Sequence, residues 1–314
     1  MQLQQLQILR ELGALGSVTA VAEALRVTPS AVSQQLAALQ RGVRAPLTRK
    51  QGRTLVLTPA GEVLAEAGAA ALDAMAAARS AVDEFEATEG GVVTVSGFLS
   101  AAQALFGPLI REIGSGPDAP VIRFTDEDVA QSDFPALTAR YDLVLAHRME
   151  HSSPWPKTGI RVLTLATEPL DVALSPDHPL AQRTSLRPAD VVGERWVTSR
   201  AGYSPDDVLR TISAITNRPA EIVHRINDYV VAASVIATGD VIGVLPRYTS
   251  AVTEAVVRRP LQYVGTNRMI DVLARPENLR RRSVRLVADG LKRVMADLTG
   301  KPPARALPRD RAIF

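Results

Sequence analysis

One long uninterrupted stretch of helix-forming residues constrains this chain more than any other feature. It begins at Thr58-Pro59, where a hydroxyl residue precedes a proline as at many helix starts, and no glycine or proline pair interrupts it before Gly90-Gly91. As one helix, this stretch would be about 45 Å long. It predicts a module over residues 1–58, a linker helix over 59–89, a larger part over 91–300 and a flexible tail over 301–314.

The linker helix carries apolar and small residues at heptad spacing. Two rows with intervals of seven, offset by four, form the a/d pattern of a coiled-coil seam. Packing against another part of the same chain would produce the same periodicity, so the pattern leaves both possibilities open. The candidate seam consists of Leu64, Ala71, Met75, Ala78, Val82 and Phe85.

Charge is unevenly distributed along the chain. Residues 1–60 contain seven basic and two acidic side chains, whereas residues 61–90 contain one basic and seven acidic side chains. A basic module suggests a polyanionic partner, although a solvated basic face has the same composition. The chain has no cysteine, which excludes disulfides and thiolate metal sites. No signal-peptide pattern or membrane-length apolar run is present, so we expect a cytoplasmic protein that does not contact a membrane.

Two short helices joined by a tight turn are predicted before residue 42. The second begins at Thr28-Pro29, and its apolar residues recur at steps of four and three. The opposite face then presents Ser30, Ser33 and Gln34. This helix-turn-helix arrangement places the start of the second helix against DNA base edges, where glutamine can pair with adenine.

Two short strands are predicted at residues 47–48 and 54–57, on either side of a hairpin. The hairpin carries Arg49, Lys50 and Arg53, which are suited to contact phosphate or a minor groove. A helix-turn-helix followed by a basic wing predicts DNA binding. The alternative is a polar helix that has no partner.

A resemblance to the LysR-type transcriptional regulators is carried by AEALRVTPSAVSQQL at residues 22–36, PL at 46–47 and LTPAGE at 57–62. The resemblance implies a winged helix-turn-helix that binds double-stranded promoter DNA, and a homodimer or homotetramer formed through the linker helix. Members usually have glutamate, glycine and phenylalanine where this chain has Gln40, Arg44 and Thr48. The implied DNA contacts are Thr28, Ser30, Ser33, Gln34, Gln35, Lys50 and Arg53.

After Gly90-Gly91, short strands alternate with helices, which predicts a parallel α/β sheet with crossover helices. Separate strands are predicted at residues 162–165 and 170–174, with a late return strand at 269–274. These two halves resemble the two-lobed, periplasmic-binding-protein-like effector domain of the same family. The resemblance implies a lobe I over 91–162 and 268–300, and a lobe II over 163–267.

In open α/β sheets, ligands bind beyond the carboxyl ends of the strands, and the family's effector cleft lies at the corresponding loops. Hydroxyl groups at a helix start and two arginines there suit a carboxylate, so an anionic small-molecule effector is one candidate. The same side chains would also serve as helix caps or face solvent. The candidate effector contacts are Ser100, His147, Arg148, Thr198, Ser199, Arg200 and Asn227.

Other functions find less support in the sequence. The string His147-Arg-Met-Glu150-His151 matches a zinc-peptidase pattern, but a strand precedes it and prolines follow it closely. No phosphate-loop, dinucleotide-binding or serine-hydrolase motif occurs, so we predict no enzyme activity, no metal and no cofactor. A solute-binding or transport accessory protein built on the same lobes is the alternative. The sequence favours a LysR-type regulator whose promoter binding is modulated by a small-molecule effector.

Overall fold

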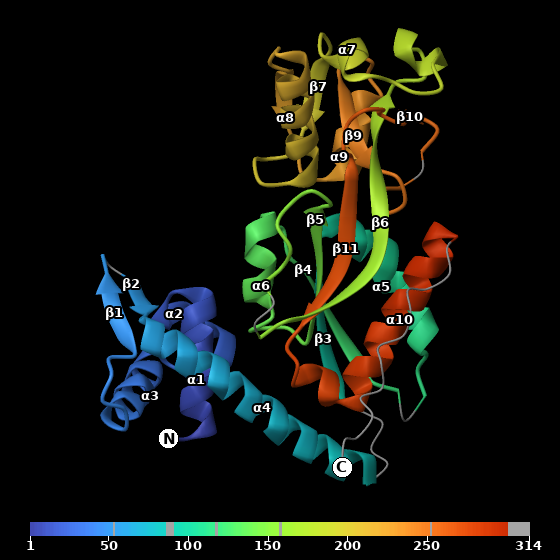
Figure 1. Ribbon diagram of the computed structural model, residues 1–314. Helices are drawn as coiled ribbons and strands as arrows, with labels where there is room; N and C mark the ends of the chain where they lie inside the picture. Colours follow the sequence, from blue (N-terminus) through green and yellow to red (C-terminus); the bar gives the residue numbers. More distant parts are fainter. Residues whose placement is uncertain (53, 86–90, 117–118, 157–158, 252, 301–314) are drawn as a thin grey trace.

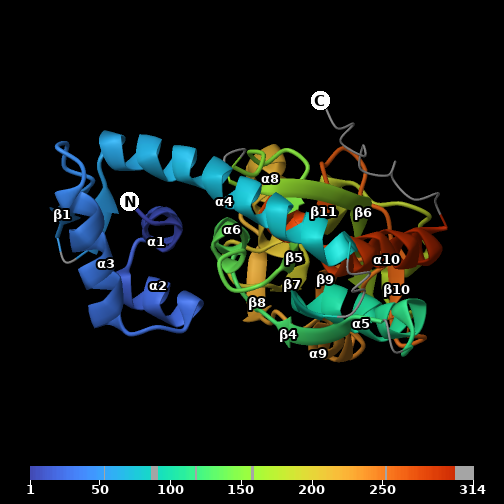
Figure 2. The same cartoon turned by 90° about the horizontal axis from the view of Figure 1, so that it is seen from below.

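The computed structural model describes residues 1–52, 54–85, 91–116, 119–156, 159–251 and 253–300 (Figure 1). The chain forms a small helical module, a long helix and a larger two-lobed α/β part. In both views the module lies to one side of the lobes, and the long helix runs from it toward them (Figures 1 and 2). Within the described residues, no helix is both long and apolar enough to cross a bilayer.

The module contains α1 (Leu3–Leu15), α2 (Val18–Leu25) and α3 (Pro29–Arg41), followed by the wing strands β1 (Thr48–Gln51) and β2 (Thr54–Leu57). The predicted start of α3 is confirmed, because the hydroxyl of Thr28 accepts a hydrogen bond from the third residue beyond it, and the hydroxyl of Ser17 caps α2 in the same way. Leucine and valine side chains from all three helices share one core with residues of the wing.

The long helix α4 (Pro59–Phe85) begins where the sequence predicts. The hydroxyl of Thr58 accepts a hydrogen bond from the Gly61 amide at 3.1 Å. A side chain at Gly61 would place its Cβ only 2.0 Å from the carbonyl oxygen of Leu47, so this close approach requires glycine. The first turns of α4 pack on the module, and Leu64 contributes to its core.

The first lobe is built on the parallel strands β3 (Val92–Gly97), β4 (Val121–Asp126) and β5 (Leu143–Met149). They are accompanied by α5 (Leu99–Ile113), η1 (Gln131–Asp133), α6 (Phe134–Leu137), η3 (Asn278–Arg280) and α10 (Arg282–Thr299). One apolar core joins α5 and α10 to these strands. The carboxyl ends of β3 and β5 face the second lobe, as Figure 1 shows. In open α/β sheets this is the edge at which ligands bind.

The second lobe is built on β7 (Arg195–Thr198), β8 (Glu221–Arg225) and β9 (Ile242–Pro246), which are also parallel. The remaining elements are η2 (Pro179–Gln182), α7 (Pro188–Val191), α8 (Ser204–Thr216), α9 (Tyr229–Ile236) and β10 (Val257–Arg259). Neither α8 nor β10 is among the elements expected from the sequence. Two smaller apolar cores lie on the two faces of this half of the sheet.

Two long strands, β6 (Arg161–Leu174) and β11 (Asn267–Ala274), pass through both lobes and pair antiparallel. Strands run in the order β4-β3-β5-β11-β6-β9-β7-β8, with β10 paired to β6. The prediction of separate strands at 162–165 and 170–174 is wrong, because hydrogen bonding to β11 continues across Glu168 and Pro169. The prediction of a parallel sheet holds within each lobe but not at these two crossing strands.

Candidate functional site

The helix α3 lies on the side of the module away from the lobes in both views (Figures 1 and 2). Ser30, Ser33 and Gln34 are exposed, and the described residues provide no hydrogen-bond partner for their side chains. The hydroxyl of Thr28 accepts a bond from the Ala31 amide at 3.2 Å, so its main contact is the helix start. A capped helix with an exposed, unoccupied polar face can enter a major groove.

Gln35 differs from the other predicted contacts. It is half-buried, and its side-chain oxygen accepts a hydrogen bond from Gln5 of α1 at 3.3 Å. Lys50 is exposed on β1, whereas Arg53 lies outside the described residues. The predicted surface therefore retains its exposed serines, Gln34 and Lys50, while Gln35 is turned toward the module.

One residue that the sequence analysis did not assign to the site fixes the turn between α3 and the wing. The Gln40 amide nitrogen donates to the carbonyls of Val43 and Ala45 at 3.0 and 2.9 Å, and its oxygen accepts from the Leu47 amide at 2.8 Å. Arg44 does not adopt a positive φ, so the absence of glycine there causes no strain. The sequence signal for this role is a glutamine at the end of a predicted helix, just before a short turn whose backbone groups need hydrogen-bond partners.

We call the region between the two lobes the cleft, and a buried ion pair lies there on the two crossing strands. Arg268 of β11 donates to Glu168 of β6 at 2.8 Å, and both side chains are almost completely buried. The carboxylate also accepts from the amides of Tyr248 and Thr249. Ser100, at the start of α5, accepts from Arg268 at 3.0 Å. The cluster thus joins both lobes and both crossing strands.

His147 lies next to this cluster on β5, and its Nδ1 is 3.0 Å from the hydroxyl of Ser204. Burial, and to a smaller extent the positive charge of Arg268, hold the pKa of His147 well below its usual range. His147 and Glu150 lie in a strand and the turn after it, not on one helical face. Among the described residues, no three histidine or acidic side chains are grouped so that they could hold a metal ion.

The two arginines predicted to bind a carboxylate already face carboxylates of this chain. Arg148 lies 3.5 Å from Asp271, on the opposite side of β5 from His147. Arg200 pairs with Asp128 of the other lobe, and the Asn227 amide donates to the same carboxylate at 3.0 Å. Arg200 and Asn227 therefore tie the second lobe to the first, whereas the Arg148 pair lies within the first lobe. The Nε of Arg148 is buried and has no hydrogen-bond partner among the described residues.

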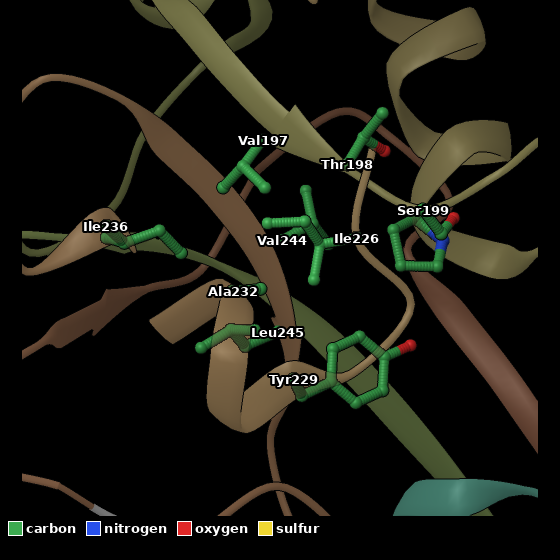
Figure 3. A pocket seen from close by; sticks show the side chains of 10 residues that line it. Val197, Thr198, Ser199, Ile226, Tyr229, Ala232, Ile236, Val244 and Leu245 are labelled. Carbon is green, nitrogen blue, oxygen red and sulfur yellow. The ribbon is translucent and has the colours of Figure 1, made fainter. Parts of the chain in front are cut away.

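A small pocket lies within the second lobe (Figure 3). Most of its lining is aliphatic, and it contains no charged side chain. The hydroxyl of Thr198 is buried there and has no hydrogen-bond partner among the described residues. Tyr229 lines the pocket, and the guanidinium of Arg268 lies 6.0 Å from the centre of its ring. Burial raises the pKa of the Tyr229 hydroxyl. The lining residues are Val197, Thr198, Ser199, Pro205, Ile226, Tyr229, Ala232, Ile236, Val244 and Leu245.

The predicted dimer seam of α4 is divided between two environments. Met75 and Val82 are exposed apolar side chains one heptad apart, at 41% and 56% exposure. Leu64 packs on the module, because the first turns of α4 cross α1. Ala71 is half-buried, Ala78 is exposed, and the side chain of Phe85 lies outside the described part.

Two family descriptions match the chain. Residues 3–62 match the bacterial regulatory helix-turn-helix proteins of the lysR family, and residues 86–296 match the LysR substrate binding domain. The uncharacterized HTH-type transcriptional regulator YybE of Bacillus subtilis is 27% identical over 252 residues, covering 78% of this chain and 82% of that protein. The transcriptional dual regulator GltC of the same organism is 24% identical, covering 88% and 92% of the two chains.

Solved structures share the whole fold. A full-length OxyR variant from Pseudomonas aeruginosa has a TM-score of 0.64 at 16% identity, covering 98% of this chain and 99% of that chain. Full-length BenM has a TM-score of 0.55 at 19% identity, with 98% and 100% coverage. CbnR complexed with its target DNA has a TM-score of 0.51 at 17% identity, with 94% and 100% coverage.

Proposed function

The chain belongs to the LysR family of transcriptional regulators, and from that premise we propose that α3 reads an operator while the lobes sense a small molecule. The observation that carries the first part is the exposed, unpartnered face formed by Ser30, Ser33 and Gln34. These groups can bond to base edges, and the helix start can hold a phosphate. Lys50, and Arg53 beyond the described residues, would contact the backbone from the wing.

The exposed apolar side chains of α4 support a dimer. Met75 and Val82 lie one heptad apart and are left exposed by the part of the chain that the structure describes, which suits pairing with a second copy of α4. Two recognition helices related by a two-fold axis would read a two-fold site. This protein would act in the cytoplasm, where it meets promoter DNA.

We propose that the ligand enters the cleft from the side of the Thr198 pocket. Arg200 and Arg268 are each neutralised by a carboxylate of the chain, so an added anion would have to displace one of these carboxylates. An uncharged molecule with an apolar body and one hydrogen-bonding group suits the lining and the free Thr198 hydroxyl better. This favours a neutral effector over the anionic candidate.

A nuclease footprint on the DNA upstream of the protein's own gene, over a salt series, tests the proposed operator reading. We expect a protected two-fold site whose affinity falls steeply with salt. Failure to bind any DNA at low salt would contradict the proposal.

A thermal-shift screen with neutral compounds and their matched carboxylates tests the ligand class. We expect the neutral members to raise the melting temperature. Stabilisation by the carboxylates alone would contradict it.

A further inference from the structure

A cluster of four charged side chains joins the DNA-binding module to the first lobe. Glu11 of α1 accepts a hydrogen bond from Arg275 at 2.7 Å, and Arg10 lies 2.7 Å from Glu277 and 2.9 Å from Glu11. Arg10, Glu11 and Arg275 are buried to more than nine-tenths. The two acids and two bases balance in charge and come from segments about 265 residues apart.

The same lobe segment also holds the linker helix. Arg280 makes a two-bonded pair with Asp73 of α4, with both distances 3.0 Å, and its carbonyl accepts from the hydroxyl of Ser80 at 2.6 Å. We call residues 275–280 the docking segment. It contacts both α1 and the second half of α4, and so it holds the module and the linker helix against the first lobe.

This contact is ionic rather than apolar. The apolar core of the module includes residues of α1–α4 and the wing, whereas that of the first lobe begins at Val93, and no described residue belongs to both. The Nε of Arg275 and one oxygen of Glu277 have no hydrogen-bond partner among the described residues. Because each of these charges regains hydration on separation, such a contact is specific in geometry and can also open.

The docking segment directly continues a strand that passes through both lobes. Arg268, near the start of β11, belongs to the cleft cluster, and Arg275 follows the last residue of the same strand. Seven residues of extended chain span about 23 Å. A change in lobe closure that tilts β11 at the cleft would therefore displace Arg275 relative to α1.

We propose that Glu11 and Arg275 are positioning residues through which the closure of the lobes sets the orientation of the DNA-binding module. This inference rests on the proposed operator reading, and it adds the route by which the lobes act on it. The Glu11–Arg275 pair is the element that both parts share. With the pair broken, DNA binding persists but no longer depends on the state of the lobes.

The chain lacks cysteine, so lobe closure can be controlled without knowing the effector. The amide of Gln131 in the first lobe donates to the carbonyl of Gly202 in the second at 3.1 Å. A Cβ at Gly202 would lie 3.2 Å from that of Ala130, so a shift of a few tenths of an ångström brings the two into the range of about 3.5–4.5 Å found in disulfides. The double variant Ala130→Cys with Gly202→Cys therefore locks the lobes when oxidised. The positive φ at Gly202 strains both redox forms equally.

The experiment measures the affinity of the full-length double variant for the footprinted operator, oxidised and reduced. We expect at least about a fivefold difference between the two forms, the lower end of typical allosteric coupling. Adding Glu11→Gln should reduce the difference to less than about twofold while leaving measurable binding. Glu112→Gln is the matched control, because it removes an ion pair between α5 and α10 within the first lobe. Adding it should preserve the difference in affinity between the oxidised and reduced forms.

An equal redox shift with and without Glu11→Gln would overturn the proposal, and so would no shift in the double variant. If Glu11→Gln unfolds the protein, the exchange Arg10→Glu, Glu11→Arg, Arg275→Glu and Glu277→Arg keeps every pair with reversed charge. That variant should fold and keep the difference in operator affinity between the oxidised and reduced forms. If it folds but shows no such difference, the proposal is overturned. Failure of the cysteine-free protein to bind operator DNA would instead contradict the operator reading.

Discussion

The polar face of α3 and the polar cleft between the lobes use similar side chains in opposite ways. On α3, Ser30 and Gln34 have no partner among the described residues, whereas in the cleft Ser100 and Thr249 are bonded to a buried ion pair. A surface that reads a fixed partner keeps its hydrogen-bonding groups available. A site that changes state instead holds an internal arrangement that a ligand can replace.

The largest expected effect comes from breaking the buried cleft pair. Glu168→Ala leaves Arg268 buried without its carboxylate, so the free energy of unfolding should fall by about 3–5 kcal/mol. Asp128→Ala is the matched control, because it removes an exposed interlobe pair and should cost less than about 1 kcal/mol. Urea denaturation of both variants measures the difference. Equal losses would show that the cleft pair is no more important to stability than the surface pair.

On α3 we expect a substitution to change DNA recognition and to leave the stability of the protein nearly unchanged. Gln34→Ala should reduce base preference at one operator position by about 1–3 kcal/mol, because one pair of base-edge bonds is lost. Its free energy of unfolding should stay within about 0.5 kcal/mol of the parent, because the side chain is exposed and unpartnered. Binding titrations against single-base operator variants test this. Gln35→Ala is the control, and we expect it to affect base preference less because Gln35 faces Gln5.

Protonation offers a milder way to disturb the cleft. The pKa of His147 is depressed in the folded protein, so the unfolded chain binds the proton more readily. The free energy of unfolding therefore decreases as the pH is lowered below the unfolded pKa, which is about 6.5. Between pH 7 and pH 5.5 this histidine should cost about 1 kcal/mol of unfolding free energy. His147→Gln should remove that part of the pH dependence, and above pH 7.5 the two profiles should run parallel. Identical acid slopes would contradict the assignment.

The two regions also differ in how far the sequence predicts them. Thr28-Pro29 and the steps among Val32, Leu36 and Leu39 are local signals, so the start, end and exposed face of α3 follow from neighbouring residues. The helix α8 has an equally local signal in Ser204-Pro205, which the sequence analysis overlooked. Helices of this kind are predictable because their hydrogen bonds join residues close in sequence.

The cleft is less predictable because its contacts are distant in sequence. Glu168 and Arg268 lie 100 residues apart, and their pairing depends on the register of β6 against β11. Glu168-Pro169 interrupts the apolar pattern, which is why one long strand reads as two. A charged side chain within a buried strand is a signal that a partner exists, but it does not identify the partner. For the same reason, the sequence around Arg200 predicts that this arginine holds a carboxylate, but it does not indicate that the carboxylate is Asp128.

The smallest expected effect separates a free hydroxyl from a bonded one inside the cleft itself. Thr198→Val removes a buried hydroxyl without a partner, so unfolding free energy should stay constant or rise by up to about 1 kcal/mol. Thr249→Val is the matched control, since its hydroxyl bonds with Glu168 and Arg268, and it should cost about 1–3 kcal/mol. Thermal melting with and without a neutral hit from the screen compares them. If Thr198→Val keeps its stability but is no longer stabilised by the ligand, the Thr198 hydroxyl is available for a partner in the same way as the polar side chains of α3. Equal destabilisation by both variants would instead mean that Thr198 is bonded in solution.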